Sequence, residues 1–205
     1  MAQALPCMSI DGIIDYILAN PNIYPGKHNH PTERTNPSQP ALEPKSQMQI
    51  IWRALITYLD NNLRQGKSVN MKKFGAFTFD IETDLPRIAR RQISADSDIG
   101  RERSERKHIH KLRPCFVVDP VLKRLLNRYK GKEEISPAGS QKSIFQQGFK
   151  MIYANPVPVA SACQMGVDVV RSTLDIIYKA IEDLINIHDK DIQLQFGFAA
   201  VSMRQ

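Results

Sequence analysis

The alternation of apolar and polar positions predicts two helices in the first third of the chain. Ser9 is a suitable N-cap for a helix from Ile10 to Leu18, whose apolar residues recur at helical spacing on one face. A second helix follows from Ser46, and its apolar stripe is wide enough to contact both the first helix and a sheet. We interpret Trp52 as a core residue rather than a stacking platform, because it lies within that stripe. The stripe comprises Met48, Ile51, Trp52, Leu55, Ile56, Leu59 and Leu63.

A hairpin pattern follows the second helix. Apolar residues recur along the segment from Val69 to Phe79, and the glycine within it marks a turn or a bulge, because glycine inside a strand pattern accompanies a bend. After this glycine, Phe77 and Phe79 alternate onto the core face of a second strand. The pattern therefore predicts two strands that meet near Phe74-Gly75.

A third strand and a short helix are predicted further along the chain. The run Phe116–Val118 is apolar and has the character of a strand. Asp119 is placed to cap a helix, and Pro120 occupies the first helical position, which proline prefers.

Residues 80–112, which we call the arm, are polar and rich in basic side chains. Carboxylates interrupt the basic residues, which suits a protein partner of mixed charge better than the phosphates of nucleic acid. We therefore rank protein docking first for the arm, a solvated loop second and nucleic-acid binding third. The interrupting acidic residues are Asp96, Asp98, Glu102 and Glu105. The predicted partner-binding residues are Arg87, Arg90, Arg91, Arg101, Arg103, Arg106, Lys107 and Lys111.

The pattern of the first half partly recurs after Pro156. A short helix is expected from Val159 to Met165, and the apolar stripe from Val167 to Ile185 matches that of the second helix. A second hairpin pattern follows from Ile192 to Met203. Because no third strand or closing helix comes after it, we expect this second unit to be a fragment or to rely on a partner.

Two segments interrupt this organisation. Residues 21–45 are crowded with prolines and poor in apolar side chains, so we expect an exposed insertion that is either a docking strap or a floppy loop. Residues 130–143 have the glycine and proline content of a linker. We expect residues 144–153 to form either a short strand or an approach segment, that is, a segment that leads into the second unit. The pattern thus predicts one domain at 9–129 and another at 144–205.

Short motifs in these elements resemble those of bacterial HU and IHF proteins. Phe74-Gly75-Ala76-Phe77 resembles their Phe-Gly-Thr-Phe hairpin, and Arg113-Pro-Cys-Phe116 resembles their closing strand. The tandem organisation is similar, more specifically, to the coiled-coil domain-containing protein 81 family, which carries two HU-like domains. The resemblance implies an α+β fold of two tandem HU/IHF-like domains, each a helical pair packed on a small antiparallel sheet with an extended arm, the second domain being incomplete.

The same resemblance implies a function. Members of that family are associated with centrosomes, cilia and flagella, which implies a structural protein of the cytoplasm and cytoskeleton, in the axoneme or at the centrosome or basal body. The implied partners are other axonemal or microtubule-associated proteins, with tubulin among the candidates. HU proteins form intertwined dimers, which implies pairing of HU-like modules within the chain or between copies. The bacterial arm carries Gly-Arg-Asn-Pro near its tip, whereas Glu102-Arg103 follows Gly100-Arg101 here. The proline of the bacterial motif is absent at this place, which weakens the expectation that this chain bends DNA as bacterial HU does.

Charge and cysteine content narrow the class of protein. The net charge of +7 fits an anionic partner such as nucleic acid, a phospholipid surface or an acidic protein. Three isolated cysteines, Cys7, Cys115 and Cys163, argue against a disulfide framework and fit a reducing compartment. No run of 18 apolar residues is present, so we expect no membrane span.

Candidate catalytic and metal-binding groups are few. No phosphate-binding loop, nucleophile elbow or zinc-protease motif occurs, so we expect neither an enzyme nor a cofactor. His28 and His30, like His108 and His110, lack a nearby third ligand, so we expect exposed loop histidines and no metal. The main alternatives to protein docking are an HU-like architectural nucleic-acid binder and a generic homodimeric interaction module.

Overall fold

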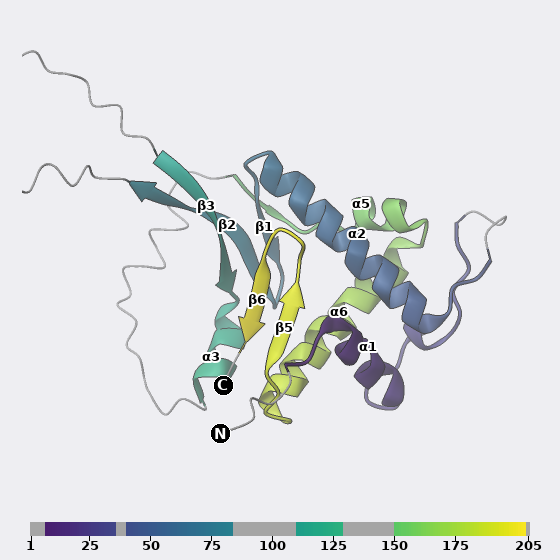
Figure 1. Ribbon diagram of the computed structural model, residues 1–205. Helices are drawn as coiled ribbons and strands as arrows, with labels where there is room; N and C mark the ends of the chain where they lie inside the picture. The colour runs from purple at the N-terminus through teal and green to yellow at the C-terminus, as the bar shows by residue number, and fades with distance from the viewer. Residues whose placement is uncertain (1–6, 36–39, 84–109, 129–149, 204–205) are drawn as a thin grey trace, which may run out of the picture.

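The computed structural model of the protein describes residues 7–35, 40–83, 110–128 and 150–203 (Figure 1). Within these ranges helices combine with a mixed sheet, which confirms the predicted α+β class. The helices are α1 (Ile10–Ala19), the 3-10 helix η1 (Lys27–Asn29), α2 (Pro44–Arg64), α3 (Pro120–Arg128), α5 (Pro156–Cys163) and α6 (Val167–Asn186). The strands are β1 (Ser68–Met71), β2 (Gly75–Thr83), β3 (His110–Val118), β4 (Met151–Tyr153), β5 (Ile192–Gln195) and β6 (Ala200–Met203).

The helices of the first half begin where local chemistry favours a helix start. The Ser9 side chain accepts a hydrogen bond from a backbone N–H of the first turn, which confirms the predicted N-cap of α1. α2 begins at Pro44, slightly before the predicted Ser46, because a proline lacks the N–H that would be unpaired there. Asp119 caps α3 by accepting a hydrogen bond of 2.8 Å from the Val121 N–H, as predicted.

The larger sheet has the strand order β3-β2-β1-β4. β2 and β3 pair in antiparallel fashion from Gly75 opposite Val118 to Thr83 opposite His110, and they form a long ribbon. β3 therefore begins well before the predicted Phe116, because its pairing with β2 continues toward the arm. β4 pairs in parallel with β1 and forms the opposite edge of the sheet.

The backbone before each short helix pairs with the hairpin of the other half of the chain. Met8, which precedes α1, forms a parallel bridge with Ile192 of β5, and its N–H donates to the Asp191 carbonyl oxygen at 2.7 Å. β4, which precedes α5, lies parallel to β1 with Ile152 opposite Val69. Two reciprocal backbone pairings thus tie the halves of the chain together (Figure 1).

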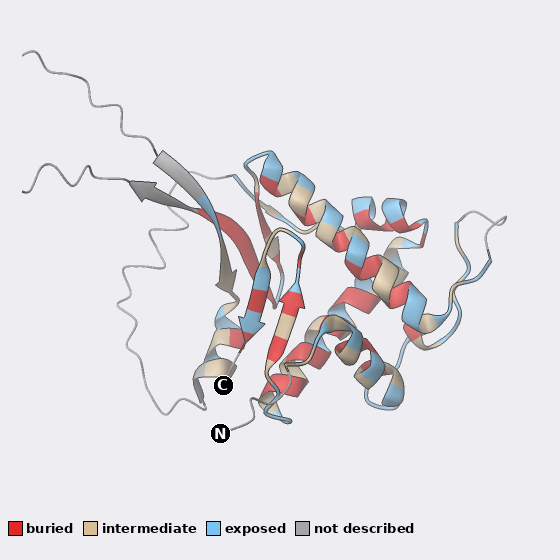
Figure 2. Ribbon diagram, viewed as in Figure 1, coloured by how far each residue is buried: buried red, intermediate tan, exposed pale blue. Residues whose placement is uncertain are grey.

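One hydrophobic core joins both halves. Phe77 and Phe79 of β2 are both buried, as their alternation predicted, and Trp52 is 2% exposed, which confirms its place in the core. The Trp52 ring lies 5.5 Å from the ring of Phe196, which belongs to the second hairpin. The helices and both hairpins turn their buried faces toward this shared interior (Figure 2).

The segment after α1 departs from its predicted exposure. Tyr24 and His28 are 1% and 0% exposed, and η1 packs against both α2 and α6. The Tyr24 hydroxyl donates to Asp183 Oδ2 of α6 at 2.8 Å. The prediction of an exposed insertion at 21–45 was therefore wrong for this part, because a buried phenol and imidazole anchor it to the core. Residues 36–39 of the insertion lie outside the described part of the chain.

The second half of the chain forms the elements that its pattern predicted. α6 covers the stripe from Val167, and β5 and β6 form the second hairpin. α5 ends at Cys163, slightly earlier than predicted, where Gln164 takes the left-handed conformation with φ 57°. Residues 144–153 contribute β4, whereas the linker predicted at 130–143 lies outside the described ranges. In the part of the chain that is described, no helix is both long and apolar enough to cross a bilayer.

Candidate functional site

The predicted arm leaves the sheet from the β2–β3 ribbon. The last described pair of the ribbon is Thr83 opposite His110, so residues 84–109 join its two strands. Lys111 lies on β3 opposite Glu82, and its side chain falls outside the described part. The contact residues predicted in the arm thus stay a prediction. Those that lie entirely outside the described ranges are Arg87, Arg90, Arg91, Arg101, Arg103, Arg106 and Lys107.

A tight turn lies at the end of β2 that is remote from the arm. The Phe74 N–H donates to the Met71 carbonyl oxygen at 3.0 Å and closes a turn over Lys72 and Lys73. Lys73 has a φ of 69°, the left-handed conformation that favours glycine at the third position of a type II turn. The turn predicted next to Gly75 is confirmed, and it holds a lysine in a strained backbone conformation.

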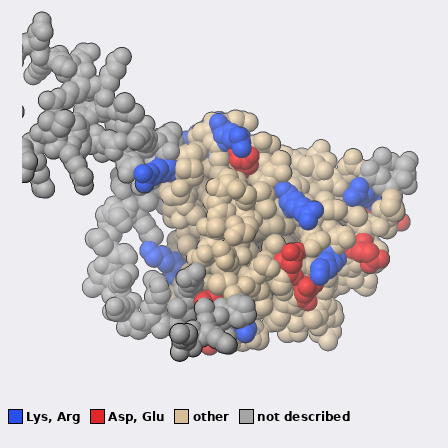
Figure 3. Space-filling model, viewed as in Figure 1, with Lys and Arg blue, Asp and Glu red and all other residues tan. Residues whose placement is uncertain are grey.

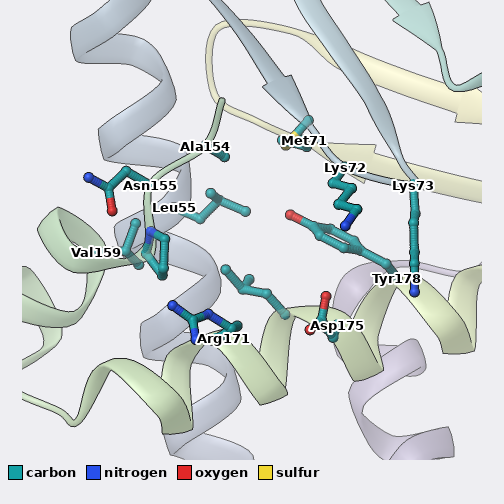
Figure 4. Close-up of a pocket in the computed structure, with 12 residues that line it drawn as sticks. Leu55, Met71, Lys72, Lys73, Ala154, Asn155, Val159, Arg171, Asp175 and Tyr178 are labelled. Atoms are coloured by element: carbon teal, nitrogen blue, oxygen red, sulfur yellow. The ribbon is translucent and has the colours of Figure 1, made fainter. Parts of the chain in front are cut away.

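This turn borders a cavity of about 330 Å³, which α2, α5 and α6 also line (Figure 4). Leu55, Met71 and Val159 form an apolar wall, and each of them is at most 1% exposed. The charged side chains that line the cavity are those of Lys72, Lys73, Arg171 and Asp175. The cavity therefore combines an apolar interior with charged groups from two distant parts of the chain.

Tyr178 of α6 turns its hydroxyl toward the cavity (Figure 4). Its ring stacks on Phe74, with the ring centroids 5.3 Å apart and the planes 17° from parallel. Burial raises the pKa of the Tyr178 hydroxyl, and the Asp175 carboxylate raises it further. The hydroxyl is therefore protonated at neutral pH and can donate a hydrogen bond to a group that enters the cavity.

The N-terminus of α5 also lines the cavity, but its backbone offers few donors. The Asn155 side chain accepts a hydrogen bond of 3.0 Å from the Val157 N–H and so occupies that donor. Pro156 and Pro158 have no N–H. The hydrogen-bond donors at this site are consequently side chains, not the amide cradle of a typical phosphate site.

Positive charge prevails around the cavity. Arg171 forms a loose ion pair with Asp168 at 3.7 Å, and because both side chains are exposed the pair contributes little. Within the described residues, Lys72 and Lys73 make no ion pair, although both are exposed. Elsewhere, on the face shown in Figure 3, basic and acidic side chains are scattered over a largely uncharged surface.

This cavity was not predicted from the sequence. The pair Lys72-Lys73 beside the predicted turn was a visible signal, since two adjacent cations at a turn favour an anionic contact. Arg171 and Tyr178, however, come from a helix in the other half of the chain. Only the packing of α6 beside the first hairpin, through the contact of Tyr178 with Phe74, brings them to the same place.

The histidine predictions have a mixed outcome. His28 is buried, so the expectation that it lies exposed in a loop was wrong, whereas His30 is exposed. His188 lies at the end of α6, where its Nε2 is 2.8 Å from the Tyr16 hydroxyl. Among the residues with described positions, no group of three or more potential ligands is arranged to hold a metal ion.

The fold defines the class of protein. A helical pair over an antiparallel ribbon, with a long insertion between the two ribbon strands, is an HU-like architecture, which is a non-enzymatic architectural and binding fold. The family model described as CCDC81 eukaryotic HU domain 1 matches residues 25–130, and the chain belongs to this family. No curated protein matches the chain. Because the match ends at residue 130, a second HU-like domain at 144–205 stays a prediction.

Proposed function

We propose that the protein is a non-enzymatic structural component of a ciliary or flagellar microtubule assembly, located at the axoneme or centrosome. It acts by docking onto other proteins of that assembly, with the arm as its main contact. The chain belongs to the CCDC81 HU family, and the cytoskeletal role is what we propose in addition.

The observation that carries the proposal is the β2–β3 ribbon. Its pairing is continuous from Gly75 opposite Val118 to Thr83 opposite His110, so it forms an ordered stem that includes both ends of the arm. Phe77 and Phe79 bury one face of this stem in the core. A stem of this kind holds Thr83 and His110 side by side, and fixing these two ends lowers the entropic cost of docking on a partner.

A protein partner fits the arm better than DNA does. Carboxylates at Asp96, Asp98, Glu102 and Glu105 alternate with the basic residues and would repel phosphates. The alternative, an architectural nucleic-acid binder, is favoured by the net charge of +7 and by the ribbon-borne arm. Both functions predict tight binding to a polyanion, so salt dependence and selectivity must separate them.

A paired binding assay tests the proposal. The full chain is sedimented with microtubules and titrated with duplex DNA over the same series of salt concentrations. We expect microtubule binding, and weak DNA binding at physiological salt. Tight DNA binding whose logarithmic salt slope reaches several units, at about 0.9 per phosphate, combined with no sedimentation, would favour the alternative.

Variants assign the contact to the arm. Replacement of Arg101, Arg103 and Arg106 by glutamine is expected to reduce sedimentation with microtubules. A matched triple replacement of the exposed residues Arg53, Lys150 and Lys190 removes the same charge elsewhere and should leave it unchanged. Equal losses in the two variants would mean that diffuse charge, not the arm, drives the binding.

Tagged protein in a ciliated cell should mark the axoneme or basal body, and a purely nuclear signal would contradict the proposal.

A further inference from the structure

We propose that the cavity beside the β1–β2 turn binds a glutamate carboxylate from an acidic peptide segment of a partner protein. This site is separate from the arm, and the inference does not depend on the microtubule role.

The size and lining of the cavity select a small ligand with an apolar stem. A volume of about 330 Å³ lies at the lower end of the range for ligand pockets, so it suits one or two side chains. Leu55, Met71 and Val159 can bury the methylene groups of such a side chain. The partly open edge leaves the peptide backbone outside.

The charges select an anion. Lys72, Lys73 and Arg171 supply cationic donors, and the Tyr178 hydroxyl adds a neutral donor that turns toward the cavity (Figure 4). Charge-assisted hydrogen bonds from such groups to a carboxylate are among the stronger polar contacts in proteins. All four of these donors lie on α6 or in the β1–β2 turn.

A single carboxylate fits better than a phosphate group. The Asp175 carboxylate at the edge repels a doubly charged group more than a singly charged one. The first backbone positions of α5 also offer no free N–H, because Asn155 occupies the Val157 donor and Pro156 and Pro158 have none. Phosphate sites at helix starts depend on these amide donors.

The backbone at Lys73 is a second, independent indication. A lysine with φ 69° is strained, and the turn would be more stable with glycine at this position. Local strain of this kind often accompanies a functional role. Lys73 lines the cavity, so the strained backbone lies at the site itself.

Fluorescence anisotropy with a labelled, end-blocked peptide rich in glutamate tests the site on the full chain. The matched probe has glutamine in place of every glutamate, and we expect it not to bind. Tyr178→Phe removes only the donor and keeps the ring that stacks on Phe74, so it should weaken binding of the glutamate peptide by about tenfold without loss of stability. Lys73→Gly should weaken binding to a similar extent while the fold becomes more stable.

Four results would overturn the inference. The charge control Lys190→Ala removes an exposed lysine that does not line the cavity, and a loss of affinity equal to that of Lys73→Gly would mean non-specific attraction. Competition by inorganic phosphate below millimolar concentration would reassign the site to phosphate ligands. Glu133 and Glu134 are an acidic pair in the sequence of the chain itself. Tighter peptide binding by the variant Glu133→Gln/Glu134→Gln would assign the cavity to that segment. Absence of binding by the unmodified protein would also reject the proposal.

Discussion

The ring of Phe77 packs edge-on against the ring of Phe196, with centroids 4.8 Å apart and planes 72° from parallel. Phe77 belongs to β2 of the first half, and Phe196 follows β5 of the second. Both side chains are at most 1% exposed. This contact makes the core of the HU-like domain dependent on a segment beyond the residues that match its family.

Truncation of this aromatic pair should destabilise the whole molecule. Phe196→Ala is expected to lower the free energy of unfolding by about 3–5 kcal/mol, since it opens a cavity in a closed core. Urea unfolding followed by both far-UV circular dichroism and Trp52 fluorescence should give a single transition. A double-mutant cycle with Phe77→Ala should yield a coupling of about 0.5–1.5 kcal/mol.

The matched control for the aromatic pair is Tyr153→Ala. Tyr153 is 75% exposed, so its loss should change the free energy of unfolding by less than about 0.5 kcal/mol. Two separate transitions in Phe196→Ala, one for each half of the chain, would contradict a shared core.

Stability should fall as the pH drops through the titration range of His28. Burial lowers the pKa of His28 below its ordinary value of 6.5, so the folded chain keeps this imidazole neutral. Below pH 6.5 the unfolded chain binds a proton that the folded chain excludes. The free energy of unfolding therefore decreases as the pH falls, until the pKa of His28 in the folded chain is reached. Urea midpoints between pH 7.5 and 5.5 measure this slope.

Replacement of His28 identifies the source of that slope. His28→Gln should show a smaller decrease in stability between pH 7.5 and 5.5 than the unmodified chain. His30→Gln, a change at an exposed neighbour, should retain the full decrease. An unchanged slope in His28→Gln would place the titrating group elsewhere.

Lys73→Gly should stabilise the protein, which is unusual for a glycine replacement. The left-handed φ of 69° strains a lysine but suits glycine, so relief of strain offsets the added freedom of the unfolded chain. We expect a gain of up to about 1 kcal/mol in the free energy of unfolding. Lys72→Gly at the preceding turn position, whose φ is not positive, should lose about 0.5–1 kcal/mol instead. Chemical denaturation of the two variants provides the comparison. Equal losses in the free energy of unfolding would contradict the backbone strain at Lys73.

Gly75→Ala should be strongly destabilising because it forces a backbone shift. A Cβ at this position would lie 2.5 Å from the Val117 carbonyl oxygen, and the φ of 154° is unfavourable for alanine. We expect a loss above about 2 kcal/mol in thermal or urea unfolding. Gly66→Ala is the matched control, since its φ is also positive but no atom lies within 4 Å, so only the strain of about 1 kcal/mol applies. Similar losses in both variants would rule out the contact with Val117.

Part of the candidate site could be predicted from the sequence, and part could not. The turn at Phe74-Gly75 and the two lysines before it were visible, because a glycine in a strand pattern signals a bend. The left-handed φ of Lys73 had no signal, since that position offers no glycine or asparagine to mark it. The place of Tyr178 depends on how α6 packs against the first hairpin, which no local pattern encodes.

The sequence by itself determined the helices, the hairpins and the faces that they bury. Helical and strand periodicity is local, so the spacing of Ile13 and Ile17 on α1, or of Phe77 and Phe79 on β2, is sufficient to define an inward face. Only the tertiary structure decided that Met8 pairs with β5 while β4 pairs with β1, and that Tyr24 and His28 leave a proline-rich segment to enter the core. These choices are made between segments far apart in the chain, where burial and backbone pairing compete and sequence spacing carries no information.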